Sequence, residues 1–360
     1  MKLDELRGEF PVLARVAYLN AGTDGPVPRR ALDAASERAG VELERGRSGG
    51  EHHAALAELA EAIRDRLASL FACDRGEVAL THSTTDGVTR VLSALELRRG
   101  DELLTSDEEH PGLLAPLAVA ARRSGATIRT VPFSALADEA GPRTRLVACS
   151  HVSWITGAVV DAVALAAAGA PVLLDGAQGL GAVPARVREL GCDFYAASGQ
   201  KWLCGPDGTG ALYVRGERIP DLVPAMTGYA SLADPRRPAE LALHPDARRF
   251  DAGSTSGPAA AWWLAALELL GGAGWEAVHE RASDLAEMLA GQLAARGLEV
   301  APRGHSTLVS WRDPEPAVAV ERLAAAGIVV RDLPGRGLVR ASVGAWNGEK
   351  EIERLVALAR

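Results

Sequence analysis

Short apolar runs alternate with helical patterns through the first two thirds of the chain. Seven of these runs are strand candidates, at residues 78–80, 102–105, 127–131, 145–149, 172–174, 194–197 and 210–214. Helical spacing of apolar positions is clear over residues 30–70, where the segment GRSGG at 46–50 divides the stretch into two helices. Strands that alternate with helices are typical of an α/β domain, so the pattern predicts a mostly parallel, seven-stranded sheet.

The pattern changes after Pro258. Two long helices are predicted first, and a second α/β unit follows them. The helices are expected at 259–270, 275–296, 317–325 and 349–358, and the strands at 298–301, 307–311, 328–331 and 338–341. A chain of 360 residues is long enough for two packed domains. We therefore expect a large domain at 1–258, whose first 28 residues line its site, and a small C-terminal domain at 259–360.

Composition and charge narrow the classes of function. Hydrophobic residues make up 48% and charged residues 24%, as in ordinary globular proteins. A net charge of −8 gives no positive field for a phosphate backbone, so a small-molecule ligand is expected rather than nucleic acid. No apolar run approaches the roughly 20 residues that cross a bilayer, and MKLDELRGEF lacks the pattern of a signal peptide. We expect a cytoplasmic protein with no membrane partner.

The cysteines indicate neither a metal site nor a disulfide framework. Cys73, Cys149, Cys192 and Cys204 form no C-x-x-C pair and have no histidine at a zinc-binding spacing. Each lies in apolar or glycine-rich sequence, where buried, inert thiols are usual. We expect four free thiols, no metal and no catalytic cysteine.

Polar side chains follow two of the predicted strands. Asp175 ends the run VLLD, and Lys201 follows another strand and the turn Ser198-Gly199-Gln200. Because ligands bind at the carboxyl ends of strands in an open parallel sheet, both side chains can face one pocket. A lysine amine that condenses with an aldehyde, and a carboxylate that keeps a pyridine nitrogen protonated, are what pyridoxal 5'-phosphate (PLP) requires. Taken singly, Asp175 would be a turn residue and Lys201 a surface lysine.

The segments DGAQ, SGQKW and GPDGTGALYV resemble the cofactor-binding region of class V aminotransferases. This family includes cysteine desulfurases, cysteine/cystine C-S lyases and enzymes similar to isopenicillin-N epimerase. The resemblance extends from YLNAGTDGPVP to the C-terminal VRASVGAWNGEKEIERLV. It implies fold type I, with PLP held as a Schiff base on Lys201 and Asp175 at the pyridine nitrogen.

The cofactor phosphate has its own candidates. In THSTTDGVTRVL, a strand end, a polar turn and a helix start can offer hydroxyls and backbone N–H groups to an anion, although helix capping is an alternative. The resemblance assigns the phosphate to Thr84, Thr85 and Ser198. Gln200 stands where many relatives have histidine, so that contact is expected from a neutral amide.

Further cofactor contacts follow from the resemblance. It places His110, from EEHPG, as a catalytic residue against the PLP ring, and Gln178 at the ring hydroxyl oxygen. His151, in HVSWITG, is either a pocket wall or a structural residue, and the role of Trp154 stays open. The segment RRFDAGSTS resembles one that reaches the partner subunit's phosphate through a residue such as Ser254 or Thr255, which implies a homodimer.

The substrate contacts are expected from both ends of the chain. The resemblance assigns Asn20, in YLNAGTDG, to substrate binding. Arg340, in VRAS, matches the arginine that binds the substrate α-carboxylate, a task suited to a planar guanidinium. Arg331, in VVRD, is similar to a second arginine of cysteine/cystine lyases, which would bind a distal carboxylate. Surface positions are the alternative for both arginines.

Several reactions occur on this fold, so the site has to select among them. Desulfurases need a cysteine shortly before the carboxylate arginine, and residues 300–360 contain none. The similarity of EEHPG, HVSWITG and NAGTDGPVP to the C-S lyases favours α,β-elimination on cystine, cysteine or an S-substituted cysteine, giving pyruvate, ammonia and a sulfur product. Transamination or epimerisation of another amino acid, or a desulfurase-like reaction, is the alternative.

Overall fold

A computed structural model describes residues 3–251, 253 and 256–360. Its largest feature is a seven-stranded sheet in the order β2-β8-β7-β6-β5-β3-β4, in which only β8 runs antiparallel to its neighbours. The predicted sheet is therefore confirmed. Its strands are β2 (Val78–Thr81), β3 (Glu102–Ser106), β4 (Thr127–Val131), β5 (Thr144–Ser150), β6 (Val172–Asp175), β7 (Phe194–Ser198) and β8 (Gly210–Val214).

Helices cover both faces of this sheet because its central strands are apolar on both sides. Successive residues of a strand face opposite sides, so Leu174 packs in one core and Leu173 in the other. The first core is closed by α3 (Gly49–Phe71), and the second by α4 (Thr84–Ala94) and α5 (Pro111–Ser124). The shorter helices are α6 (Leu136–Glu139), α7 (Ala162–Ala167) and α8 (Val187–Leu190).

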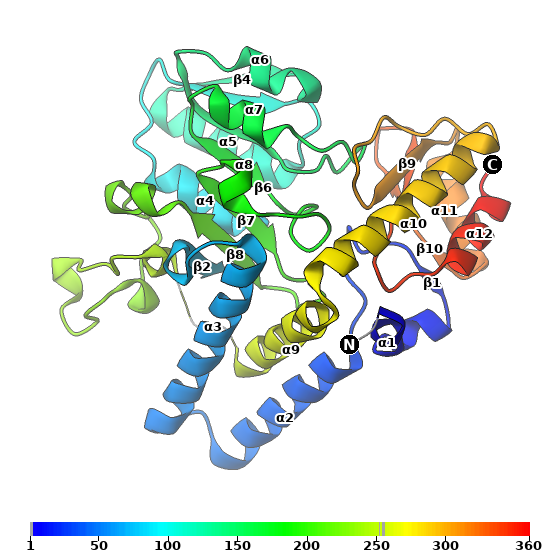
Figure 1. Ribbon diagram of the computed structural model, residues 1–360. Helices are drawn as coiled ribbons and strands as arrows, with labels where there is room; N and C mark the ends of the chain where they lie inside the picture. Colours follow the sequence, from blue (N-terminus) through cyan, green and yellow to red (C-terminus); the bar gives the residue numbers. More distant parts are fainter. Residues whose placement is uncertain (1–2, 252, 254–255) are drawn as a thin grey trace.

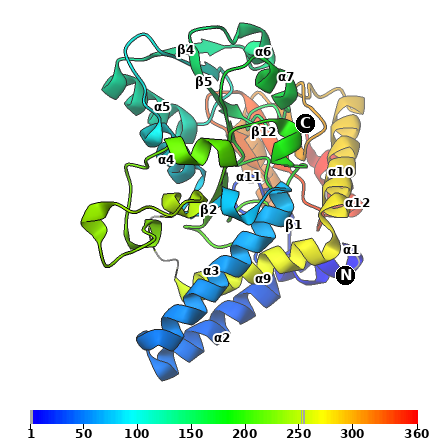
Figure 2. The ribbon, with the colours of Figure 1, turned by 60° about the vertical axis from the view of Figure 1, so that its left-hand side comes forward.

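Three long helices pack side by side at the edge of the large sheet. α2 (Arg29–Arg45) and α3 are separated at the predicted glycine-rich break, where Gly46 has a φ of 77°. α9 (Gly257–Ala273) lies along both helices, as the views in Figures 1 and 2 agree, and its Trp263 is buried in the first core. The predicted division at residue 258 thus falls beside a helix that packs on the large unit, and the domain boundary stays a prediction.

A smaller unit follows α9. Its antiparallel sheet has the order β11-β12-β9 and is covered by α10, α11 and α12 (Figure 1). The N-terminal part of the chain joins this unit, because β1 pairs with β10 in parallel. The elements are α1 (Leu3–Gly8), β1 (Ala17–Tyr18), α10 (Trp275–Ala295), β9 (Leu308–Arg312), α11 (Pro316–Ala325), β10 (Ile328–Val329), β11 (Arg331–Leu333), β12 (Leu338–Ser342) and α12 (Glu349–Leu358).

Two of the predicted strands differ in the structure. The segment at 298–301 makes only a bridge from Val300 to Trp311, because Pro302 follows and has no N–H to continue the ladder. The segment at 328–331 is split into β10 and β11, because the chain passes at Val330 from one sheet to another. Within the described residues, no helix is long and apolar enough to span a membrane.

Candidate active site

A cavity of about 270 Å³ lies at the carboxyl ends of the large sheet's strands and reaches the small sheet. Ten of the predicted site residues line it together. They are Thr84, Thr85, His110, Asp175, Gln178, Ser198, Gln200, Lys201, Arg331 and Arg340. Asn20 is not in the lining, and Ser254 and Thr255 lie outside the described residues. The lining brings together elements that are up to 318 residues apart in sequence, from Gly22 to Arg340.

Lys201 and Asp175 carry shifted pKa values in this cavity. Asp175 ends β6 and is 5% exposed, and burial raises the pKa of its carboxyl although the nearby Lys201 cation opposes that change. Lys201 follows β7, and burial lowers the pKa of its amine to about 8, opposed by Asp175 and assisted by Arg340. Since only a neutral amine is a nucleophile, the cavity prepares Lys201 to attack a carbonyl carbon.

The amide of Gln178 is fixed by two neighbours with unambiguous roles. The indole Nε1 of Trp202, which can only donate, lies 3.1 Å from Oε1 of Gln178. Nε2 of Gln178 therefore donates to the Gly22 carbonyl oxygen, at 2.8 Å. One N–H of Nε2 remains for an acceptor atom in the cavity.

Hydroxyls and a helix N-terminus form one end of the cavity. α4 begins after Ser83, whose Oγ accepts from the Asp86 N–H at 3.1 Å. Ser198 Oγ accepts from the Thr84 N–H at 3.0 Å and lies 2.7 Å from the Thr84 hydroxyl. Exposed backbone N–H groups at the first turn of a helix favour an anion. This end of the cavity is suited to a phosphate.

Gln200 adds an unsatisfied amide to the lining. Its Oε1 is buried and has no hydrogen-bond partner among the described residues. A buried amide without a partner is costly, so a ligand that completes its hydrogen bonds is favoured. Its backbone carbonyl is already used, because it accepts from the Gly25 N–H at 2.7 Å.

His110 lies at the start of α5 as its N-cap residue. Its Nδ1 accepts from the Gly112 N–H at 3.0 Å, so the ring proton is on Nε2. Desolvation and the cations Lys201, Arg331 and Arg340 lower the pKa of His110 to about 4. The ring meets Trp154 edge to face, with centroids 5.1 Å apart. A neutral, planar imidazole is therefore held in the cavity by two contacts.

Arg340 presents one free edge to the cavity. The residue is 1% exposed, and its Nη1 donates to the Trp154 carbonyl oxygen at 2.8 Å. Nε and Nη2 are buried and have no hydrogen-bond partner among the described residues. Burial and the neighbouring Arg331 lower the pKa of Arg340 to about 9, which leaves it cationic at pH 7. A carboxylate is the group that matches two parallel N–H donors.

Arg331 lies beside Arg340 because their strands pair. β11 and β12 are antiparallel and place the two residues directly opposite each other. Nη1 of Arg331 donates to the Thr23 hydroxyl at 3.3 Å, and this hydroxyl donates to Oδ1 of Asn20 at 2.9 Å. Asn20 therefore lies behind Thr23 instead of in the lining. Two adjacent cations form the small unit's side of the cavity.

The two aromatic residues left open by the sequence have different positions. Trp154 lines the cavity and is half-buried. His151 is 2% exposed and is not in the lining. Its Nδ1 lies 2.9 Å from the Tyr195 hydroxyl, and burial lowers the pKa of His151 to about 4. His151 is thus a buried residue beneath the site.

Several lining residues were not named from the sequence: Gly22 and Thr23 fall within the segment 1–28 that was expected to line the site, and Gly112 was not expected. A Cβ at Gly22 would lie 3.0 Å from Nη2 of Arg340 and 2.8 Å from Oε1 of Gln178. The glycine therefore lets the N-terminal loop approach the site closely. The expectation that residues 1–28 line the site and the two glycines of NAGTDGP pointed to this loop, but neither assigned a role to Thr23.

No cysteine is among the residues that line this cavity in the described part of the chain. All four cysteines are free. Burial raises the pKa of Cys73 and of Cys192 to about 12. Their thiols are therefore protonated and poorly nucleophilic at neutral pH.

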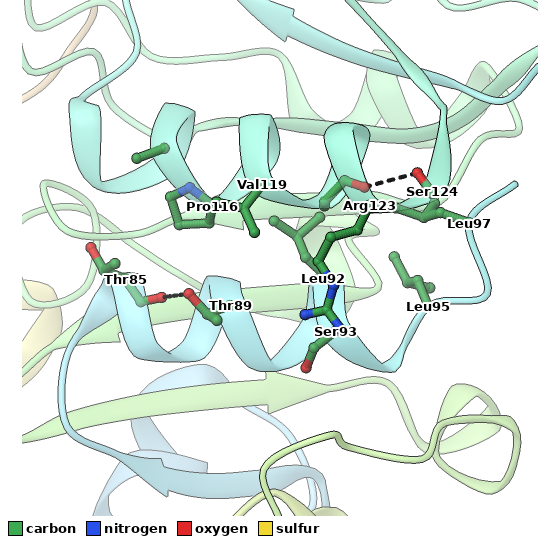
Figure 3. A pocket seen from close by; sticks show the side chains of 12 residues that line it. Thr85, Thr89, Leu92, Ser93, Leu95, Leu97, Pro116, Val119, Arg123 and Ser124 are labelled. Atoms are coloured by element: carbon green, nitrogen blue, oxygen red, sulfur yellow. Dashed lines mark hydrogen bonds between the residues drawn. The ribbon is translucent and has the colours of Figure 1, made fainter. Parts of the chain in front are cut away.

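A second cavity lies next to the first. Figure 3 shows this space of about 510 Å³ between α4 and α5, lined mostly by apolar side chains such as Leu92 and Val119. Thr85 lines both cavities. Arg123 is the single charged residue among the described residues that line this second cavity. Among those residues there is therefore no lysine, carboxylate or histidine of the kind that the first cavity offers for catalysis.

The fold and the cavity, with an activated lysine, a buried carboxylate and an anion site, define a PLP enzyme of fold type I. The family profile described as aminotransferase class-V matches residues 17–355. The chain therefore belongs to the class V aminotransferase family.

Relatives and solved structures extend this result. The chain is 32% identical to a cysteine desulfurase of Escherichia coli O127:H6, over 81% of this chain and 78% of that one. It is 30% identical to isopenicillin N epimerase of Streptomyces clavuligerus, over 98% and 96%. It also resembles C-DES, at 30% identity in each of two structures. One is a mutant with glycine covalently linked to the PLP cofactor, with a TM-score of 0.92 over 98% of both chains. The other is the cystine C-S lyase with its reaction product, cysteine persulfide, with a TM-score of 0.90 over 97% and 98%.

The chain is thus a class V PLP enzyme similar to cysteine desulfurases and C-S lyases, and PLP is its cofactor. The groups in the cavity fit this cofactor. Asp175 makes no ion pair among the described residues, so a protonated pyridine nitrogen would offset the cost of burying its carboxylate. The first turn of α4 and the amide of Gln200 lie in the same lining, where the Nε2 group of that amide can donate to a phosphate oxygen.

Proposed function

We propose that this protein is a PLP-dependent carbon-sulfur lyase that performs α,β-elimination on cystine. The observation that carries the proposal is the pair of cations on the small sheet, with the free edge of Arg340 in the cavity and Arg331 directly opposite it in the sheet. Cystine is an amino acid that presents a second carboxylate beyond its sulfur atoms. The resemblance to C-DES, a cystine C-S lyase, supports the same substrate.

Each cofactor contact in the proposal uses a group described above. Lys201 would hold PLP covalently, Asp175 would bind the pyridine nitrogen, and Gln178 would donate its remaining N–H to the ring hydroxyl oxygen. His110 would pack against the ring. Thr84, Thr85, Ser198 and the Nε2 group of Gln200 would bind the phosphate. When bound, PLP withdraws electrons from the substrate Cα.

The chain's residues then handle the substrate and its protons. Arg340 binds the α-carboxylate through Nε and Nη2, and Arg331 binds the distal carboxylate. The amine of Lys201 would remove the Cα proton as a general base, for which a pKa near 8 is suited. The Cβ–S bond breaks and its electron pair leaves with sulfur. Cystine and water thus give pyruvate, ammonia and cysteine persulfide.

Epimerisation is the second candidate. It starts with the same proton removal from Cα and ends with proton return, and the 30% identity to isopenicillin N epimerase over nearly the full chain favours it as the alternative. A persulfide on the enzyme is disfavoured, because none of the described lining residues is a cysteine. We also propose that the enzyme is a homodimer in which Ser254 or Thr255 reaches the partner's phosphate site.

The two arginines provide a test of the substrate. Arg340→Ala should lower kcat/KM on every amino-acid substrate, since all carry an α-carboxylate, and loss of a buried bidentate pair costs on the order of 2 to 5 kcal/mol. Arg331→Ala should lower kcat/KM on cystine at least tenfold, which corresponds to about 1.4 kcal/mol of lost transition-state stabilisation. On S-methylcysteine the loss should be much smaller. Steady-state assays on both substrates measure the difference. An equal loss on both for Arg331→Ala would remove the main support for cystine.

A further inference from the structure

The unpartnered edge of Arg340 depends on one backbone oxygen. Nη1 of Arg340 donates to the carbonyl oxygen of Trp154, and this is the hydrogen bond that orients the guanidinium. The bond joins residues 186 positions apart, one in a turn after β5 and the other in β12. The position of the 153–157 turn therefore decides which edge of Arg340 faces the cavity.

This turn lies between the two units of the protein. Its Ile155 carbonyl accepts from the Ser310 hydroxyl at 2.5 Å, and its Gly157 carbonyl accepts from the Ser306 hydroxyl at 2.6 Å. Ile155 also packs with Leu333 in a small buried cluster. The small unit thus donates hydrogen bonds to three backbone carbonyls of the four-residue segment 154–157. A shift of the turn would move all three contacts.

Glu108 holds the turn from the side of the large sheet. One carboxylate oxygen, Oε2, accepts hydrogen bonds from the Ser153 hydroxyl and from the Thr156 hydroxyl, the latter at 2.6 Å. Ser153 Oγ also accepts from the N–H of Ile155 at 3.2 Å and of Thr156 at 3.1 Å, so it closes the turn. Among the described residues the Glu108 carboxylate makes no salt bridge and accepts from these two hydroxyls, while the Glu108 N–H donates to Ser106 Oγ at 3.2 Å.

We propose that Glu108 is a positioning residue for the amino-acid carboxylate: it fixes the 153–156 turn, and the Trp154 carbonyl then holds Arg340 with Nε and Nη2 toward the cavity. The inference rests on the proposed role of Arg340. A hydrogen bond to a charged group is stronger than one between neutral groups, so the half-buried carboxylate is suited to hold two hydroxyls at once. Glu108 touches neither substrate nor cofactor in this arrangement.

The test measures ligand binding without turnover. PLP-loaded protein is titrated with glycine and with glycinamide, which lacks the carboxylate, and the change in cofactor absorbance gives each affinity. Each variant is compared with the wild type on the same ligand, so the different basicities of the two amines cancel. Glu108→Ala should weaken glycine binding about tenfold and change glycinamide binding less than twofold. Glu108→Gln should restore glycine binding, because an amide oxygen can accept both hydroxyls.

Two further variants separate the possible failures. Thr156→Val removes one hydroxyl without changing the segment that carries His110, and it should weaken glycine binding in the same direction by about threefold; it also serves if Glu108→Ala does not fold. Arg340→Ala should weaken glycine binding by at least about 30-fold and spare glycinamide. If Arg340→Ala spares glycine, the proposed role of Arg340 is wrong. Suppose that Arg340→Ala weakens glycine binding selectively. If Glu108→Ala then leaves glycine binding unchanged, or weakens glycine and glycinamide binding equally, the proposed role of Glu108 is overturned.

Discussion

Burial shifts the pKa values of Lys201 and Asp175 in opposite directions. It lowers the pKa of Lys201 and raises that of Asp175, so each residue is moved toward its neutral form while their mutual attraction opposes the change. An amine with a pKa of about 8 in place of 10.5 is neutral roughly 300 times more often at pH 7. This shift suits Lys201 both for capturing the cofactor aldehyde and for removing a proton from the substrate.

The pH dependence of cofactor capture tests this shift. Below pH 8 the neutral fraction of Lys201 rises about tenfold per pH unit, and above its pKa it is constant. The rate at which the cofactor-free protein captures PLP, followed by near-visible absorbance, should therefore level off near pH 8. In Arg340→Ala the break should move to higher pH, because a cation that lowers the pKa of Lys201 is removed. A wild-type rate that rises to pH 10 would contradict the shift.

At the residue scale, the position of a side chain in the cavity could be predicted where it follows a strand, while its role stays a prediction. Asp175 and Lys201 end or follow apolar runs, and the parallel topology then brings them to one edge of the sheet. Glu108 and Trp154 were not assigned roles, because their contacts depend on a turn and a strand far away in sequence. The substrate role of Asn20 stays a prediction, and its side chain accepts from the Thr23 hydroxyl instead of lining the cavity itself. The Thr23 hydroxyl lies between Asn20 and Arg331, and a contact of this kind leaves no pattern in a sequence.

At the scale of elements, the seven strands of the large sheet and the helices α2, α3 and α9 to α12 were predicted from periodicity, whereas α1 and α5 to α8 were not given bounds. The errors are in the small unit, where a proline ends the pairing at 298–301 and where residues 328–331 are divided between two sheets. The contact between the loop at 20–25 and the turn at 199–205 was also not predicted. It depends on Gly25, whose N–H donates to the Gln200 carbonyl.

Two glycine substitutions test this contact. A Cβ at Gly25 would lie 2.1 Å from the Lys201 carbonyl oxygen, so Gly25→Ala forces the two loops apart at a cost of about 1 to 3 kcal/mol. It should lower Tm and weaken PLP retention. Gly40, within α2, has no atom within 4 Å of such a Cβ, and Gly40→Ala should stabilise the protein by up to about 1 kcal/mol without changing PLP retention. If both variants behave alike in thermal melts and dialysis, the close approach does not matter.

At the scale of the whole molecule, the cavity is assembled from parts that lie far apart in the sequence. The large sheet supplies Lys201 and Asp175, the small sheet supplies Arg331 and Arg340, and the N-terminal loop fills the space between them. The family and its cofactor follow from this assembly and from the sequence relatives. The reaction depends on which bond at the substrate's Cα or Cβ breaks after proton removal, and the fold is the same for each outcome.

The most direct test of the proposed function is to identify the products from cystine. Purified protein loaded with PLP is incubated with cystine, and pyruvate, ammonia and sulfane sulfur are measured together, with Lys201→Ala as the control. The account predicts pyruvate, ammonia and persulfide sulfur in equal amounts and none from Lys201→Ala. D-configured cystine without pyruvate would indicate epimerisation, and a keto acid that keeps the substrate's carbon-sulfur bond would indicate transamination; either result would contradict the lyase.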